Sequence, residues 1–237
     1  MDTISIIITS YRRLDFIKNL LDSLKRNTHY VSYEVIVVNS DPGYNEYKDD
    51  YLTRKNALKE IILVSDEPKQ YMEANESAFV VSTGNYILLL NDDALIPSTE
   101  NMWLDILHDY LKDHDDVQCL SPYQFMARGV LYTKGELDIN KPGRTNGTRS
   151  NLKDLPYELE TVWNPFSCAL FRRSFILENR FLDVVPEPQY HYGSDSCYCR
   201  TILDKGFKNV TINSTWIYHF NNRVMNRQVE RYTYNES

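Results

Sequence analysis

An asparagine and two aspartates, Asn91, Asp92 and Asp93, directly follow the apolar run Leu88–Leu90. Carboxylate oxygens are the ligands that Mg²⁺ and Mn²⁺ prefer, so adjacent acids at the end of a buried strand can bind a divalent cation. The same residue types are also favoured in ordinary turns. The secondary structure expected around the motif distinguishes a metal site from a turn.

Strands and helices alternate along the first hundred residues. Continuous apolar, β-branched runs predict buried strands, and apolar residues at helical spacing predict helices. The expected strands are 4–9, 34–38, 61–64 and 86–90, and the expected helices are 14–25 and 72–81. This alternation favours an α/β fold with an open, mostly parallel sheet and helices on both faces.

Ligands of such sheets bind just beyond the carboxyl ends of the strands. The segments expected at that edge are 9–13, 39–41, 65–67 and 91–93. The acids of the motif are therefore expected beside polar groups from other strand ends, which favours a ligand site over an isolated turn.

The second half of the chain predicts a more mixed arrangement. The expected elements are helices 100–111 and 194–205 and strands 117–120, 168–171, 210–212 and 216–218. Residues 135–158 are polar and contain glycine and proline, which predicts a long loop that covers a substrate. Residues 221–237 predict a polar tail.

Four segments, in this order, resemble the family-2 glycosyltransferases of GT-A fold. Residues 6–13 are similar to the first strand and nucleotide loop of that family, and residues 35–41 are similar to its second strand. Residues 74–88 resemble the helix and glycine turn before the metal motif, and residues 91–93 fall where the family has its D-x-D motif. The resemblance is close over residues 4–95 and looser beyond them.

The resemblance implies an inverting, hexosyltransferase-like enzyme that moves a sugar from a nucleotide-diphosphate donor to an acceptor hydroxyl. Asp93 and His219 would hold Mn²⁺ or Mg²⁺ at the leaving diphosphate. Asp195, in the first turn of a helix whose dipole favours its ionised form and lowers its basicity, would be the general base. The residues assigned to the nucleotide-sugar are Thr9, Tyr11, Arg13, Asn39, Asp66, Lys69, Asn75, Asn91 and Asp92.

Some of these positions have a second explanation or depart from the family pattern. An Asp such as Asp195 can merely complement a helix dipole, and a lone histidine such as His219 can be structural. Asn39 replaces a usual Asp that reads the base, Asn91 replaces the first acid of D-x-D, and Gly193-Ser194 replaces a usual Glu. An alternative is therefore a catalytically inactive module of the same fold that binds sugar or serves in assembly.

Other function classes fit less well. Residues 10–13 contain no glycine, which disfavours a nucleotidyltransferase, and no acid, which disfavours a phosphatase with D-x-D after its first strand. The net charge of −7 argues against a nucleic-acid partner. The expected partners are the nucleotide-sugar donor and a glycan, lipid-linked or protein acceptor.

We expect one domain over residues 1–237, with a nucleotide-sugar half (1–97), an acceptor half (98–220) and the polar tail. No apolar stretch approaches the roughly 20 residues that span a bilayer. The four cysteines lack the paired spacing of a zinc site and indicate reduced thiols, so the sequence predicts a cytoplasmic protein.

Overall fold

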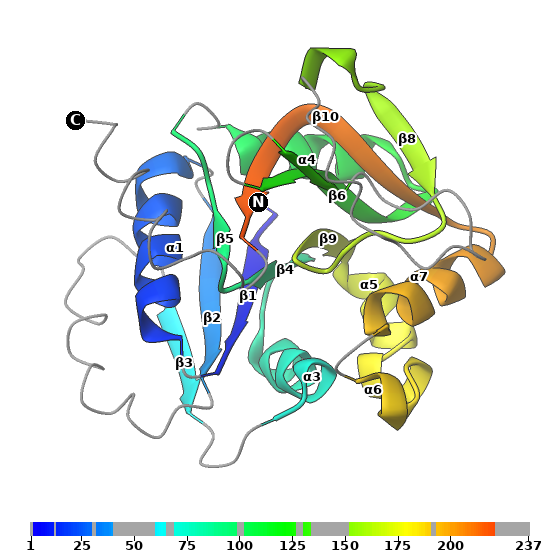
Figure 1. Ribbon diagram of the computed structural model, residues 1–237. Helices are drawn as coiled ribbons and strands as arrows, with labels where there is room; N and C mark the ends of the chain where they lie inside the picture. Colours follow the sequence, from blue (N-terminus) through cyan, green and yellow to red (C-terminus); the bar gives the residue numbers. More distant parts are fainter. Residues whose placement is uncertain are drawn as a thin grey trace.

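A computed structural model describes residues 2–11, 13–29, 32–39, 60–64, 69–98, 102–126, 130–133, 152–190 and 193–220. One sheet runs through these residues in the strand order β3-β2-β1-β4-β9-β6-β10-β5 (Figure 1). Two further strands extend it, because β7 pairs with β6 and β8 pairs with β10. Helices pack on both faces of the sheet, as the sequence predicted.

The first half of the sheet consists of four parallel strands. They are β1 (Ile4–Ser10), β2 (Tyr33–Asn39), β3 (Glu60–Val64) and β4 (Tyr86–Asn91). Helices α1 (Leu14–Asn27) and α3 (Tyr71–Val81) lie on opposite faces of them. Because both faces are covered, β1 and β4 contain continuous apolar runs, Ile6–Ile8 and Ile87–Leu90.

Alternate residues of β1 enter two separate cores. Ile6 and Ile8 pack in the same buried cluster as Leu20 of α1. Ile7 packs in the other cluster, with Met72 and Phe79 of α3. Successive side chains of a strand point to opposite faces, so this single strand fixes the positions of both helices relative to the sheet.

The second half adds antiparallel pairs to the sheet. Its strands are β5 (Ala94–Leu95), β6 (Val117–Met126), β7 (Val130–Thr133), β8 (Glu158–Thr161), β9 (Cys168–Arg172) and β10 (Lys208–His219). Its helices are α4 (Trp103–Asp113), α5 (Arg173–Glu178), α6 (Phe181–Val184) and α7 (Ser194–Asp204), with short turns of 3₁₀ helix at η3 (Leu152–Asp154) and η4 (Glu187–Gln189). Strand β9 lies between β4 and β6 and is antiparallel to both, which joins the two halves.

A buried carboxylate holds the amino ends of the first strands together. Glu34 Oε1 accepts hydrogen bonds from Ser5 Oγ (2.7 Å), Thr83 N (2.6 Å) and Thr83 Oγ1 (3.0 Å). The N–H of Gly84 donates to Ser5 Oγ at 2.8 Å, and a Cβ at Gly84 would lie only 2.6 Å from the Ser5 nitrogen. Only glycine fits this turn, which starts β4 beside β1.

The predicted α/β fold with a mostly parallel central sheet is confirmed. The expected strands 210–212 and 216–218 form one continuous strand, β10, with an irregularity between Ile212 and Trp216. Strand β6 runs six residues beyond the expected end at residue 120, and α4 begins at Trp103 rather than at residue 100. Strands β5, β7 and β8 and helices α5 and α6 were not predicted.

Several predictions concern residues outside the described ranges. These include Asp66, the tail 221–237 and most of the expected loop 135–158; the described end of that loop forms η3 and the start of β8. The division into a single domain stays a prediction. Across the described ranges, none of the helices has both the length and the apolar composition needed to cross a bilayer.

Candidate active site

The carboxyl ends of β1, β2 and β4 meet at one edge of the sheet. Ser10 of β1 lies opposite Asn39 of β2, and Thr9 lies opposite Asn91 of β4. Asn39 is buried and Thr9 is partly exposed. The strand ends that the sequence placed on one edge therefore lie side by side in register, and the acidic motif begins there.

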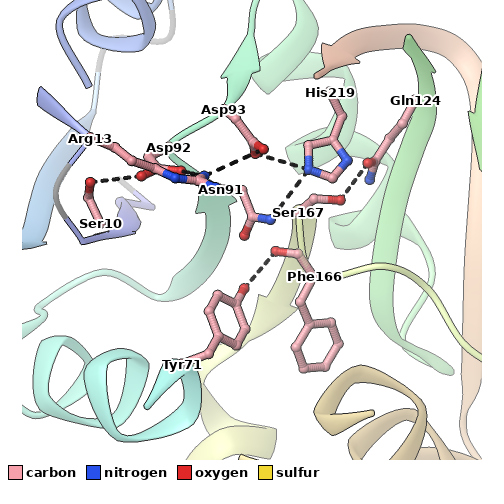
Figure 2. Close-up of polar contacts among 10 residues, drawn as sticks. All are labelled: Ser10, Arg13, Tyr71, Asn91, Asp92, Asp93, Gln124, Phe166, Ser167 and His219. Atoms are coloured by element: carbon pink, nitrogen blue, oxygen red, sulfur yellow. Dashed lines mark hydrogen bonds and ion pairs between the residues drawn. The ribbon is translucent and has the colours of Figure 1, made fainter. Parts of the chain in front are cut away.

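Asp92 connects this motif to the start of α1. Its carboxylate accepts a hydrogen bond from Ser10 Oγ at 2.7 Å and forms an ion pair with Arg13 Nη1 at 2.8 Å (Figure 2). Burial raises the pKa of Asp92 to about 6, and the positive charge of Arg13 limits that rise. The carboxylate thus fixes the segment that the sequence assigned to the nucleotide loop.

Asp93 faces His219, which lies at the end of β10. Asp93 Oδ1 lies 3.0 Å from His219 Nε2, and each residue is only 4% exposed. The backbone N–H of Phe220 donates to the Asp93 carbonyl oxygen at 3.0 Å, and His219 lies opposite Ala94 of β5. Short β5, which was not predicted, therefore brings a histidine from late in the sequence to the acidic motif.

A guanidinium and an amide also contact the Asp93–His219 pair. Arg13 Nη1 lies 3.6 Å from Asp93 Oδ2, and Asn91 Nδ2 lies 3.4 Å from His219 Nε2. One guanidinium thus contacts both carboxylates, and Asn91 contributes an amide where the family pattern has the first acid of D-x-D.

The donor atoms of Asp93 and His219 suit a divalent cation. A carboxylate oxygen and an imidazole nitrogen face each other, and this mixed pair fits a first-row ion such as Mn²⁺ better than Mg²⁺, which prefers oxygen. Across the part of the chain that the structure describes, no three His, Cys, Asp or Glu residues cluster as metal ligands. The protein's share of a cation site here would be two side chains.

Asp195 lies in the first turn of α7. The chain enters this helix through Gly193, whose φ of 84° is a conformation that glycine adopts readily. Asp195 Oδ1 accepts the N–H of Ser196 at 2.8 Å. Burial raises the pKa of Asp195 to about 6, although backbone hydrogen bonds lower it. The expected lowering of its basicity by the helix start is therefore wrong, because burial has the larger effect.

Tyr71, at the start of α3, was not predicted as a site residue. Burial raises its pKa, and the negative charges of Asp195, Asp93 and Asp92 raise it further. Its Oη donates to the Phe166 carbonyl oxygen at 2.9 Å (Figure 2).

Ser167, the residue after Phe166, forms hydrogen bonds that hold the strand ends at the site together. The Ser167 carbonyl accepts the N–H of Asn91 at 3.0 Å, and Ser167 Oγ donates to Gln124 Oε1 at 2.5 Å. Figure 2 shows Ser167 and Gln124 beside His219. No sequence signal distinguished these residues, because Gln124 lies on β6 and Ser167 lies just before β9, 43 positions later.

The other predicted residues lie in different settings. Tyr11 is exposed after β1, and Lys69 is exposed before α3. Asn75 is buried within α3, where its amide donates to the Tyr71 carbonyl oxygen at 2.9 Å. The structure thus brings Arg13, Asn91, Asp92, Asp93 and His219 into direct contact, while Asn75 is used inside its own helix.

Residues 5–179 match the family model described as glycosyl transferase family 2. This match covers more than half of the chain. The chain belongs to glycosyl transferase family 2. The resemblance seen in the sequence is thereby confirmed, although no curated protein sequence matches this family-2 chain.

Solved structures of glycosyltransferases share the fold. The crystal structure of GalNAc-T7 with UDP, GalNAc and Mn²⁺ gives a TM-score of 0.75 at 14% identity, over 95% of this chain and 44% of that one. The mannosyltransferase PcManGT from Pyrobaculum calidifontis, in complex with GDP-Man and Mn²⁺, gives 0.67 at 18%, over 98% and 59%. S. aureus TarS 1-349 gives 0.62 at 13%, over 92% and 60%.

These likenesses establish the GT-A fold of this family-2 member. The chain spans between 44% and 60% of the length of the three proteins. What those proteins bind is therefore not transferred directly to this chain.

Proposed function

We propose that the protein transfers a sugar from a nucleotide-diphosphate donor to an acceptor hydroxyl, with inversion at the anomeric carbon. The contact of Asp93 with His219 at the carboxyl edge of the sheet carries the proposal. Asp195, in the first turn of α7, is the acid proposed as the base. The neighbours with UDP and Mn²⁺ and with GDP-Man and Mn²⁺ support a nucleotide donor and a cation.

Negative charge develops on the diphosphate as its bond to the sugar breaks. Asp93 and His219 would hold Mn²⁺, or Mg²⁺, beside that group. The bound ion supplies Lewis-acid stabilisation of the leaving group. Arg13 adds a fixed positive charge at the same place, since its guanidinium is held against Asp92 and Asp93. Its side chain is 24% exposed, which leaves part of the guanidinium accessible to a ligand.

Asp195 takes the proton of the attacking hydroxyl. A pKa of about 6 leaves this carboxylate ionised near pH 7.5, yet makes it a stronger base than an ordinary aspartate. Direct attack on the face opposite the leaving diphosphate inverts the anomeric centre, since no covalent intermediate forms. The acceptor hydroxyl is therefore expected within about 2.6–3.2 Å of an Asp195 oxygen.

The competing function is a binding module without turnover. Asn39 and Asn91 favour it, since each replaces an acid of the family pattern. Asp93, His219 and Asp195 favour turnover, because together they provide what leaving-group stabilisation and proton removal require. Nucleotide release from the donor distinguishes the two functions.

A donor panel tests the proposal. The protein is incubated with UDP-, GDP- and dTDP-sugars in Mn²⁺, Mg²⁺ or EDTA, and the free nucleotide is measured. We expect release from one nucleotide class, dependent on the ion. Nucleotide binding without release from any donor, even with a range of glycan acceptors, would favour the binding module.

Thermal shift with UDP, GDP or dTDP tests the cation site separately. A ligand that binds only the folded state raises its melting temperature, and here the rise should appear with Mn²⁺. Asp93→Ala should abolish the Mn²⁺-dependent part, whereas Asp183→Ala on the exposed surface of α6 should leave it intact. A normal response of the Asp93 variant would place the ion elsewhere.

A further inference from the structure

Gln124 is a fully buried amide near the carboxyl end of β6, with an exposed fraction of 0%. Its Oε1 accepts the hydrogen bond from Ser167 Oγ at 2.5 Å. Among the residues that the structure describes, none accepts a hydrogen bond from Gln124 Nε2, which is also buried. An amide N–H that is buried without an acceptor is costly, so its position needs a physical reason.

The strand register brings Gln124 to the same face of the sheet as His219. Gln124 lies opposite Ile217 of β10, and His219 follows Ile217 by two residues on the same face of that strand. Neighbouring strands lie about 4.8 Å apart and rise about 3.3 Å per residue, so two long side chains at these positions can meet. Figure 2 shows the amide of Gln124 pointing toward the imidazole ring.

A chain of contacts joins Gln124 to the other side of the same ring. Ser167, whose hydroxyl bonds to Gln124, accepts the N–H of Asn91 at its carbonyl oxygen at 3.0 Å. Asn91 Nδ2 lies 3.4 Å from His219 Nε2, and Asp93 Oδ1 lies 3.0 Å from the same nitrogen. The acidic motif thus uses Nε2 of the ring, and a hydrogen bond between the ring and β6 has to involve Nδ1.

We propose that Gln124 is a positioning residue whose amide is the hydrogen-bond partner of His219 Nδ1. The inference rests on the proposed function, in which His219 Nε2 holds a cation. Before an ion binds, the proton on Nε2 can be donated to Asp93, and Nδ1 accepts an N–H from the Gln124 amide. In this setting the buried amide nitrogen has its acceptor.

Cation binding requires the other tautomer of the ring. His219 Nε2 then presents its lone pair, so one proton leaves Nε2, one binds Nδ1, and the ring stays neutral. A half-turn of the Gln124 amide brings Oε1 to the Nδ1 proton, while its Nε2 donates to Ser167 Oγ. An amide can serve both tautomers because it has a donor and an acceptor, whereas a carboxylate serves only the second and a thioether neither.

Mn²⁺ affinity tests this arrangement. The dissociation constant is measured from the electron paramagnetic resonance signal of free Mn²⁺, in saturating UDP or GDP, whichever stabilises the parent. Gln124→Met keeps the volume but removes the hydrogen bond, and should weaken Mn²⁺ binding by about 10- to 100-fold. Gln124→Glu should bind Mn²⁺ at least as tightly as the parent, because its carboxylate accepts the Nδ1 proton.

The nitrogen chemical shifts of the His219 ring give a second readout, which needs neither metal nor nucleotide. The ring is identified by the signals that are lost in His219→Asn. Gln124→Met should move the Nδ1 shift. Gln118→Met is the matched control and should move neither the shift nor the Mn²⁺ affinity. Gln118 is a 5% exposed glutamine on the same strand, and its amide donates to the Asp115 carbonyl oxygen at 3.0 Å.

Two results would overturn the inference. One is an unchanged Nδ1 shift in folded Gln124→Met, or in Gln124→Leu if the former does not fold. The other is a loss of Mn²⁺ affinity in Gln124→Glu equal to that in Gln124→Met, which would make Gln124 a packing residue only. Failure of the proposed function appears differently, as a parent that releases nucleotide from no donor, and the ring shifts still test the contact of Gln124 with His219.

Discussion

Buried acids lie at both ends of the parallel half of the sheet. Glu34, at the amino ends, is 3% exposed, and Asp92 and Asp93, at the carboxyl ends, are each 4% exposed. Glu34 accepts hydrogen bonds from hydroxyl groups and a backbone N–H. Asp92 also accepts a hydrogen bond from a hydroxyl group, that of Ser10, but Asp92 contacts a guanidinium in addition and Asp93 contacts an imidazole.

Burial is therefore not what separates a structural acid from a candidate catalytic one. The hydrogen-bond donors to Glu34 described above are uncharged and lie on β1 and in the turn before β4, so exchanging them would disturb that turn. Arg13 carries a guanidinium and His219 an imidazole, and groups of these kinds can transfer their interactions to a phosphate or a metal ion. We expect variants at the two ends to separate stability from activity.

The largest effect is expected from Asp195→Asn. The variant keeps the size of the side chain but removes the proton acceptor, so sugar transfer should slow by roughly 10²–10⁴-fold, with little change in nucleotide affinity. Steady-state rates with the donor found in the panel measure this. Asp183→Asn and Glu187→Asn, both at exposed positions, are controls, and normal transfer by the Asp195 variant would end its assignment as the base.

The next effect is expected at the other end of the strands. Glu34→Gln retains one acceptor oxygen but loses the charge that strengthens three hydrogen bonds, which should lower the free energy of unfolding by about 1.5–3 kcal/mol. Urea denaturation measures the change, with Glu178→Gln on the exposed surface of α5 as the control. Weakened nucleotide binding at unchanged stability would contradict a purely structural role for Glu34.

The smallest effect is a gain in stability. Because the pKa of Asp195 is raised to about 6 in the folded state, folding favours the protonated acid, and this contribution is present below about pH 4 and lost as pH rises through 6. Asp195→Asn removes the cost of burying the ionised form. The variant should melt at a higher temperature than the parent at pH 8, by the equivalent of about 1 kcal/mol, and near the parent at pH 4. An equal difference at both pH values would contradict the raised pKa.

The parallel half of the fold could be predicted because a strand that is buried on both faces contains a continuous run of apolar residues. Strands β1 and β4 are such runs, and their ends mark the edge where ligands bind. The second half gave weaker signals. Strand β5 has only two residues, and polar Asn213 and Ser214 interrupt the apolar pattern of β10 although the strand continues through them.

The candidate site divides in the same way. The acids of residues 91–93 were visible because they follow a strand directly. Tyr71 was not, since its hydrogen bond joins residues 95 positions apart and no local pattern reports such a contact. The role of Glu34 was equally hidden. An acid at the start of a strand gives no indication of the residues that it contacts on neighbouring strands.

The pairing of β10 with β5 also has a consequence for the order in which contacts form during folding. Asn91 and His219 are 128 residues apart, so a growing chain has its acidic motif long before its histidine. Contacts of such sequence separation form late in folding, since a long loop must close first. We therefore expect the contact between the acidic motif and His219, and with it the proposed cation site, to form late in folding.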